Sequence, residues 1–199
     1  MIDAEEAARA NLYGLIARLL QAAPDDQLIA EMVRAGEIEA EGEAGSEAAA
    51  LAAAWRAMID ASRTAFPNAL KDEHTTLFVG TGKAEVTPYL SAYVLRHSTD
   101  NPLVDLRQQL ESWRIGRKEG VPEYEDHIAA ICETMRFAIA VQQRSASEQK
   151  MFFERFLYRG ATAFCSAVTT SKNARFYVHV ARFAQTFFDI EKTAFEMGG

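Results

Sequence analysis

The stretch "FYVHVARFAQTFFDIEKTA", from Phe176 to Ala194, decides the fold class. Its apolar residues recur at intervals of 4, 3, 4, 3 and 4, the spacing that places side chains on one face of an α-helix. The spacing predicts one continuous helix that is packed along its whole length. The residues of this stripe are Phe176, Val180, Phe183, Phe187, Ile190 and Ala194.

The same spacing of apolar side chains recurs along most of the chain, and no long stretch alternates apolar and polar residues. The sequence therefore predicts an all-α fold, a helical bundle of about eight or more helices. Pro24 ends the first helix, because proline cannot continue the hydrogen bonds of a helix. Capping residues and prolines predict further helix starts at Asp25 or Asp26, Ser46, Pro67, Asn101, Pro122, Ser147, and Ser171 or Asn173.

Length and charge limit the possible functions. The chain has 199 residues, of which 49% are hydrophobic, and this is enough to bury one core as a single domain over residues 1–199. It carries 28 acidic and 21 basic side chains, which gives a formal net charge of −7. An acidic surface repels the phosphate backbone, so we expect no nucleic acid as a partner and favour a basic one.

The N-terminal segment "MIDAEEAARA" has acidic residues where a signal peptide would carry lysine or arginine. No apolar run follows it at the length that an export signal or a membrane span requires. We therefore expect a cytoplasmic protein without membrane insertion. Cys132 and Cys165 stand among apolar residues at helical spacing and have no CxxC partner, which is typical of buried thiols.

The segment from Gly80 to Asn101, "GTGKAEVTPYLSAYVLRHSTDN", is the longest part of the chain without a clear apolar stripe. Irregular segments of about 20 residues in compact domains are usually functional or disordered, and the aromatic content here argues against disorder. Its GxGK does not match the phosphate-binding loop, which needs GxxxxGK[ST] between a strand and a helix. The segment is therefore a candidate functional region, with no nucleotide site expected.

A second candidate region is "GVPEYEDHIAAICETM", Gly120 to Met135, where Glu123, Glu125, Asp126 and His127 precede an apolar helix. Acidic residues near a helix N-terminus are stabilised by its partial positive charge, so these carboxylates need no chemical role. A protonated histidine gains nothing there, and His127 is expected to be neutral or paired with an acid. The sequence also lacks GxSxG, which argues against a catalytic serine of that type.

A metal site is not expected from the sequence. The residues three before His74, His97, His127 and His179 are not glutamate, so the Glu-x-x-His pattern of di-metal bundles is missing. HExxH is missing as well, although Glu123 and His127 are four apart and could share one ion. We therefore expect no metal and no cofactor.

Taken together, two segments resemble the TorD/DmsD/NarJ family of cytoplasmic chaperones for molybdenum-containing oxidoreductases. In that family an LF-x-G segment leads into a P-Y-x-S-x-Y loop, and a later E-x-x-DH motif opens a helix. The corresponding residues here are Leu77, Phe78 and Gly80; Pro88, Tyr89, Ser91 and Tyr93; and Glu123, Asp126 and His127. The resemblance extends over about residues 12–195, but Phe156 and Gly160 stand where the family often has histidine and tryptophan.

The resemblance implies two helical halves joined by a hinge at about residues 116–122, and either a monomer or a homodimer formed by exchange of halves. It implies a function without catalysis: binding the twin-arginine leader or the apo catalytic subunit of a molybdoenzyme until the molybdopterin cofactor is inserted. The segments "TPYLSAY" and "DIEKTAFEM" are similar to members associated with formate dehydrogenases.

A twin-arginine leader is a basic segment followed by an apolar one, so its receptor should offer carboxylates beside an apolar groove. The residues expected to bind it are Tyr89, Ser91, Tyr93, Glu123, Glu125, Asp126 and His127. In the simpler alternative, Tyr89 and Tyr93 only pack against the core. The alternative function is a helical-bundle metal protein or enzyme that uses Glu123, Asp126 and His127.

Overall fold

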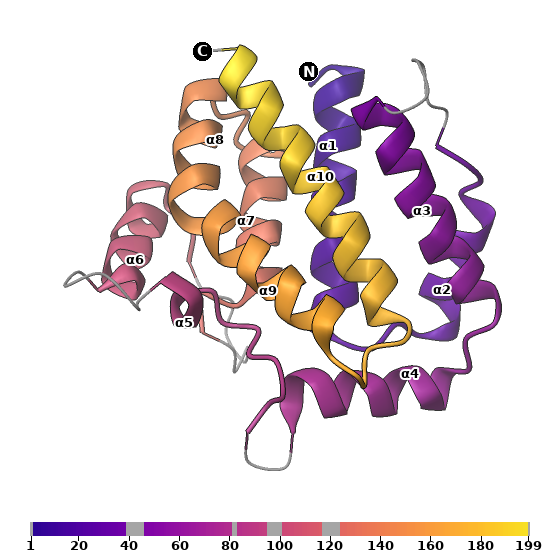
Figure 1. The fold of residues 1–199 in the computed structure, drawn as a ribbon. Helices are drawn as coiled ribbons and strands as arrows, with labels where there is room; N and C mark the ends of the chain where they lie inside the picture. The colour runs from indigo at the N-terminus through magenta and orange to yellow at the C-terminus, as the bar shows by residue number, and fades with distance from the viewer. Residues whose placement is uncertain (1, 39–45, 81–82, 95–100, 117–123, 199) are drawn as a thin grey trace. The chain divides into compact units, whose positions relative to one another are not determined.

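The computed structural model describes residues 2–38, 46–80, 83–94, 101–116 and 124–198. All regular elements within these residues are helices, which confirms the all-α prediction (Figure 1). The one β-type pairing among them is an isolated antiparallel bridge between Tyr89 and His127. None of the described helices combines the length and the apolar character that a membrane span needs.

The chain forms two compact units, each assembled from separate parts of the sequence. The first contains residues within Met1–Gln21 and Thr87–Phe164, and the second contains residues within Ala22–Val86 and Cys165–Gly198. The proposed hinge at residues 116–122 lies, apart from Gly116, outside the described residues, so it stays a prediction.

Helices of the first unit pack mainly on α7. α1 lies along α7, and each contributes side chains with no exposed surface, among them Tyr13 and Ile16 from α1 and Cys132 and Met135 from α7. The helices are α1 (Ala4–Gln21), α5 (Ser91–Val94), α6 (Pro102–Ser112), α7 (Ile128–Ala140), α8 (Ala146–Phe152), the π-helix η3 (Phe153–Tyr158) and the start of α9 (Arg159–Thr170).

The second unit is organised around the pairing of α3 with α10, which Figure 1 shows in purple and yellow. The ring of Phe183 packs against that of Trp55, with 5.5 Å between the ring centroids. The helices are α2 (Asp26–Arg34), α3 (Glu47–Arg63), α4 (Pro67–His74), the π-helix η1 (Thr75–Val79), the end of α9 and α10 (Tyr177–Met197).

The buried face of α10 departs from the predicted stripe in its last turns. The first four residues of the stripe are buried, but Ile190 is half-buried and Ala194 is exposed. Phe188, Glu191 and Phe195 are buried instead. The reason is geometric: a 3.5-residue repeat drifts by about 20° per seven residues on a helix with 3.6 residues per turn, so the buried face moves to the following positions.

Two predicted helix starts are wrong by a few residues. α7 begins at Ile128 with His127 as its N-cap, rather than at Pro122, since residues 124–127 form a turn. α8 is capped by Ser145 rather than Ser147, because Glu148 completes a capping box with Ser145. The predicted caps Asp25, Ser46 and Asn101 are confirmed, each by a side-chain hydrogen bond to the first turn.

The start of α10 has no capping side chain of its own, contrary to the expectation for Ser171 or Asn173. The Glu73 carboxylate, at the end of α4, accepts hydrogen bonds from the backbone N–H groups of Arg175, Phe176 and Tyr177, at 2.8, 3.1 and 2.8 Å. These donors lack partners within the helix, so a carboxylate from about 100 residues earlier in the chain serves as the cap.

Replacing Phe183 by alanine should lower the free energy of unfolding by about 3–5 kcal/mol, because a fully buried ring against Trp55 is lost. Denaturant unfolding followed by circular dichroism measures this loss. The matched control is Ile190→Ala on the same helix, where a half-buried side chain should give a clearly smaller loss. Equal losses would contradict the assignment of the buried face.

Candidate peptide-binding site

Backbone hydrogen bonds join the two motifs, which are about 35 residues apart in the sequence. The N–H of Leu90 donates to the carbonyl of Asp126 at 2.9 Å, and the N–H of Ile128 donates to the carbonyl of Pro88 at 2.9 Å. Together they form the bridge between Tyr89 and His127. The structure therefore places the P-Y-x-S-x-Y loop directly against the start of α7.

Asp126 fixes this junction with its side chain. Its carboxylate accepts a short hydrogen bond from the Ser91 hydroxyl and a longer one, 3.4 Å, from the Ser91 N–H. The residue is only 5% exposed, and a buried carboxylate is tolerated only where hydrogen bonds replace its hydration. Asp126 therefore holds the site together from within and presents little surface to a ligand.

His127 also has a structural role, as the N-cap of α7. Its Nδ1 accepts a hydrogen bond from the Ala129 N–H at 3.2 Å, and the residue is 6% exposed. The ring meets that of Tyr89 edge to face, with centroids 5.5 Å apart. A nitrogen that accepts a hydrogen bond carries no proton, so His127 presents the neutral imidazole to the helix N-terminus.

The tyrosines of the loop take different positions. Tyr93 is half-buried: its hydroxyl donates to the Thr87 carbonyl at 2.8 Å, and its ring lies edge-on to Phe164. Tyr89 is also half-buried, but its ring contacts the ring of Tyr124, which is 55% exposed. Tyr89 and Tyr124 therefore form the aromatic part of the surface, whereas Tyr93 supports the loop.

The glycine at position 160 has a local explanation. A Cβ at Gly160 would lie 2.8 Å from the Cβ of Leu90 and 3.2 Å from its carbonyl oxygen, which is too close for any larger residue. Leu90 itself is 2% exposed. In this chain the loop therefore packs onto α9 at the place where the family that it resembles often has tryptophan.

Glu125 is the predicted acidic residue closest to the surface among the described ones. Its carboxylate forms an ion pair with Arg107 of α6, with 3.1 Å between the two charged groups and side-chain exposures of 19% and 48%. Glu123 lies outside the described residues. The sequence did not identify Arg107, because only the fold brings α6 beside the E-x-x-DH motif.

A pocket of about 380 Å³ lies beside this ion pair, around the end of α6. Its walls combine the apolar side chains of Leu110 and Ile115 with charged side chains from α6 and from the turn before α7. The lining residues are Arg107, Leu110, Glu111, Arg114, Ile115, Gly116 and Glu125. The candidate site thus consists of the half-buried Tyr89 with the exposed Tyr124, the Glu125 carboxylate and this pocket.

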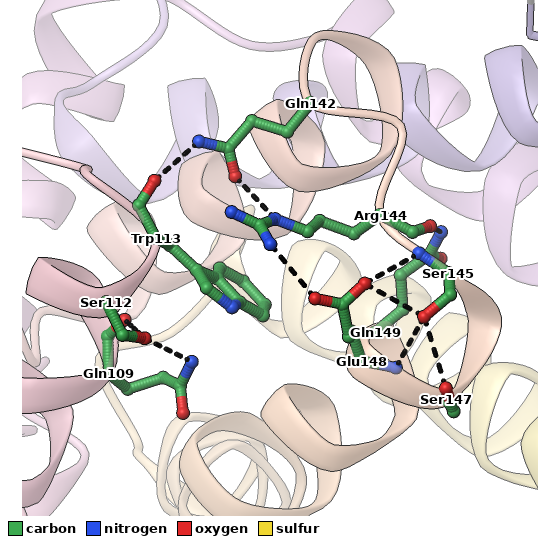
Figure 2. A network of polar contacts seen from close by, with 9 residues as sticks. All are labelled: Gln109, Ser112, Trp113, Gln142, Arg144, Ser145, Ser147, Glu148 and Gln149. Atoms are coloured by element: carbon green, nitrogen blue, oxygen red, sulfur yellow. Dashed lines mark hydrogen bonds and ion pairs between the residues drawn. The ribbon is translucent and has the colours of Figure 1, made fainter.

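A second pocket of about 480 Å³ borders the polar network of Figure 2. Arg144 lies over the Trp113 ring and donates to Gln142 and Glu148, at 2.9 Å in both cases. Gln142 in turn donates to the Trp113 carbonyl at 2.7 Å. These contacts tie the ends of α6 and α7 to the start of α8, so the network stabilises the first unit.

Chemistry at a metal centre has no support in the described residues, which contain no group of three or more histidine, cysteine or acidic side chains placed to hold an ion. Burial raises the pKa of the Cys165 thiol to about 12, so this side chain is protonated at neutral pH. The arrangement of the candidate site suits the binding of a peptide.

Replacing Asp126 by alanine should lower the free energy of unfolding by about 1–3 kcal/mol, since Ser91 loses the carboxylate that accepts its hydrogen bonds. Thermal and denaturant unfolding measure the loss. The control Glu125→Gln, which opens a more exposed ion pair, should change stability by less than about 1 kcal/mol. Wild-type stability of Asp126→Ala would contradict the structural role.

The contribution of Glu148 to the free energy of unfolding should be lost as the pH is lowered. Its hydrogen bonds with Ser145, followed by that with Arg144, hold the pKa of this carboxyl below its ordinary value of 4.5. A lowered pKa in the folded state adds stability above the unfolded-state pKa, and this stability is lost as the pH falls. Wild type should therefore lose more stability than Glu148→Gln between about pH 5 and pH 3; parallel unfolding curves would contradict this.

Comparison with known proteins identifies the family. Residues 44–188 match the family described as the nitrate reductase delta subunit. The chain is also similar to a crystal structure from Archaeoglobus fulgidus, of a protein proposed to be a redox enzyme maturation protein. The TM-score is 0.58 and the sequence identity is 15%, and the match covers 91% of this chain and 93% of that chain. This similarity shows a shared fold. No curated protein matches the chain. The family match spans more than half of the chain, so the protein belongs to the nitrate reductase delta subunit family, in agreement with its resemblance to TorD, DmsD and NarJ.

Proposed function

We propose that this protein is a cytoplasmic maturation chaperone that binds the twin-arginine leader or the apo catalytic subunit of a molybdopterin oxidoreductase until its cofactor is inserted. The observation that carries the proposal is the family match over residues 44–188, which includes both motifs of the candidate site. The structural neighbour, proposed to be a redox enzyme maturation protein, supports the same general function.

We propose separate roles for the six expected site residues that the structure describes. Glu125 and Tyr89 lie where a peptide can reach them, and Tyr124 extends this surface. Ser91, Asp126, His127 and Tyr93 position the loop and the start of α7 through the contacts described above. Glu123 remains a proposed contact on its sequence position alone.

The contacts suit a leader of the twin-arginine type for a chemical reason. Arginine prefers carboxylates because its planar guanidinium matches their geometry, and it also stacks on aromatic rings. The Tyr89 and Tyr124 rings contact each other, and the Glu125 carboxylate lines the pocket together with the apolar Leu110 and Ile115. Binding alone accounts for these features, so the proposed function involves no catalysis.

The client that we favour is a formate dehydrogenase, because the "TPYLSAY" and "DIEKTAFEM" segments are similar to relatives associated with those enzymes. The protein is proposed to act as a monomer or as a homodimer formed by exchange of halves. The proposed hinge at residues 116–122 lies between the two motifs, so exchange of halves would assemble each candidate site from the Tyr89 loop of one chain and the Asp126 motif of the other.

The proposed function predicts binding of a synthetic twin-arginine leader from a formate dehydrogenase, measured by isothermal titration calorimetry at low and moderate salt. Replacing both leader arginines by alanine should weaken binding by at least about tenfold, because the charged contacts with the acidic site are lost. Higher salt should weaken the wild-type leader more than the alanine leader.

Leaders from other molybdoenzymes serve as the comparison that identifies the client. Equal binding of the arginine and alanine leaders would contradict recognition of the twin arginines. If no leader binds, a pull-down with the apo catalytic subunit decides between recognition of the mature part and rejection of the proposed function. A stoichiometric metal in the purified protein would instead favour the metal-protein alternative.

A further inference from the structure

The pocket at the end of α6 has balanced charges, although the chain as a whole is acidic. Two arginines, Arg107 and Arg114, and two glutamates, Glu111 and Glu125, line it. Arg107 is paired with Glu125, and this pair forms part of the pocket wall. The pocket therefore already contains a carboxylate with a guanidinium bound to it.

The pair can open at little cost. One nitrogen of Arg107 lies 3.1 Å from one oxygen of Glu125, and nearly half of the Arg107 side chain is exposed to solvent. Ion pairs of this exposure contribute little to stability, because water and salt compete for both partners. Glu125 is more buried, at 19% exposure, so it stays in place while Arg107 is able to move away.

The end of α6 itself favours a cation. The carbonyl groups of the last helical turn carry a partial negative charge, and α6 has no basic residue in that turn to offset it. The chain then reverses direction at Arg114, which has a φ of 55°, and the Ile115 N–H donates to the Leu110 carbonyl at 2.9 Å. This reversal places the apolar Ile115 and Leu110 beside the negative helix end.

We propose that this pocket is a guanidinium-binding site, which Arg107 closes in the free protein and which a partner's arginine opens by displacing Arg107 from Glu125. Leu110 and Ile115 would contact the aliphatic part of the incoming side chain, as arginine stems commonly pack on apolar surface. The inference extends the proposed function, because it assigns one leader arginine to Glu125 and makes Arg107 its internal competitor.

The exchange has a measurable consequence. Binding to wild type must break the Arg107–Glu125 pair and then bring a second guanidinium close to the displaced one, and both effects reduce affinity. Removing the Arg107 side chain removes both costs. The Arg107→Ala variant should therefore bind an arginine-containing peptide more tightly than wild type does. The variant also removes one positive charge from the protein, so a control for net charge is needed.

The test compares three variants by calorimetry with the twin-arginine leader. Arg107→Ala should bind about two- to fivefold more tightly, the ratio expected from breaking an exposed ion pair. Its affinity should also fall more steeply with salt, because the pocket lining then has a net negative charge. Glu125→Gln should bind at least about tenfold more weakly. Thermal unfolding of each variant checks that the fold is retained.

The matched control is Arg155→Ala. Arg155 of η3 forms an ion pair with Asp105, which lies on α6 as Arg107 does. The charged groups are 2.7 Å apart, and the side-chain exposures of 54% and 36% are comparable with those of the Arg107–Glu125 pair. Neither Arg155 nor Asp105 lines the pocket. This variant removes one positive charge and one exposed ion pair, as Arg107→Ala does. Its affinity for the leader should equal that of wild type, so a gain shared by both variants would reflect net charge alone and overturn the proposal.

The outcomes separate this inference from the proposed function. Leader binding that is unchanged or weakened in Arg107→Ala overturns the inference and leaves the proposed function standing. If no leader binds, the pull-down with the apo catalytic subunit decides the proposed function, and an N-acetylated Arg-Arg amide titrated in an NMR experiment decides the inference. The inference is supported if the amide signals of Gly116 and Glu125 shift more in Arg107→Ala than in wild type, and if these shifts are lost in Glu125→Gln. The inference is overturned if Arg107→Ala shows no such larger shifts.

Discussion

The first unit depends on the junction between Pro88–Ser91 and Asp126–Ile128. Two backbone hydrogen bonds align these segments, and the buried Asp126 carboxylate closes the junction by accepting from Ser91. A carboxylate removed from water must keep such partners, so the position of one segment dictates the position of the other. The start of α7 and the orientation of Tyr89 over His127 both follow from this constraint.

Much of the fold could be predicted, because apolar periodicity and local capping depend on residues close together in the sequence. Asp25, Ser46 and Asn101 cap their helices as expected. Periodicity alone could not predict where α10 begins, since its cap is the distant Glu73. It also assumed a fixed 3.5-residue spacing, which failed at Ala194 as the buried face shifted along a regular helix.

The candidate site was predictable as a group of residues, but not in its internal arrangement. The motifs indicated that Ser91 and Asp126 belong to one site, and the structure joins them directly. Sequence treated Glu125 and Asp126 alike, as two carboxylates next to each other. Burial distinguishes them: Asp126 is enclosed and committed to the loop, whereas Glu125 reaches the surface and meets Arg107. Pairings between distant segments have no signature in local composition.

The capping of α10 by Glu73 has a consequence for the order of folding. A helix of 21 residues whose first N–H groups are bound by a side chain about 100 residues earlier gains this stabilisation only when α4 is already in place. During synthesis, Glu73 leaves the ribosome long before Tyr177 does. The cap therefore forms only after the C-terminal segment has been synthesised, and folding of the second unit is completed only when that segment docks against α4.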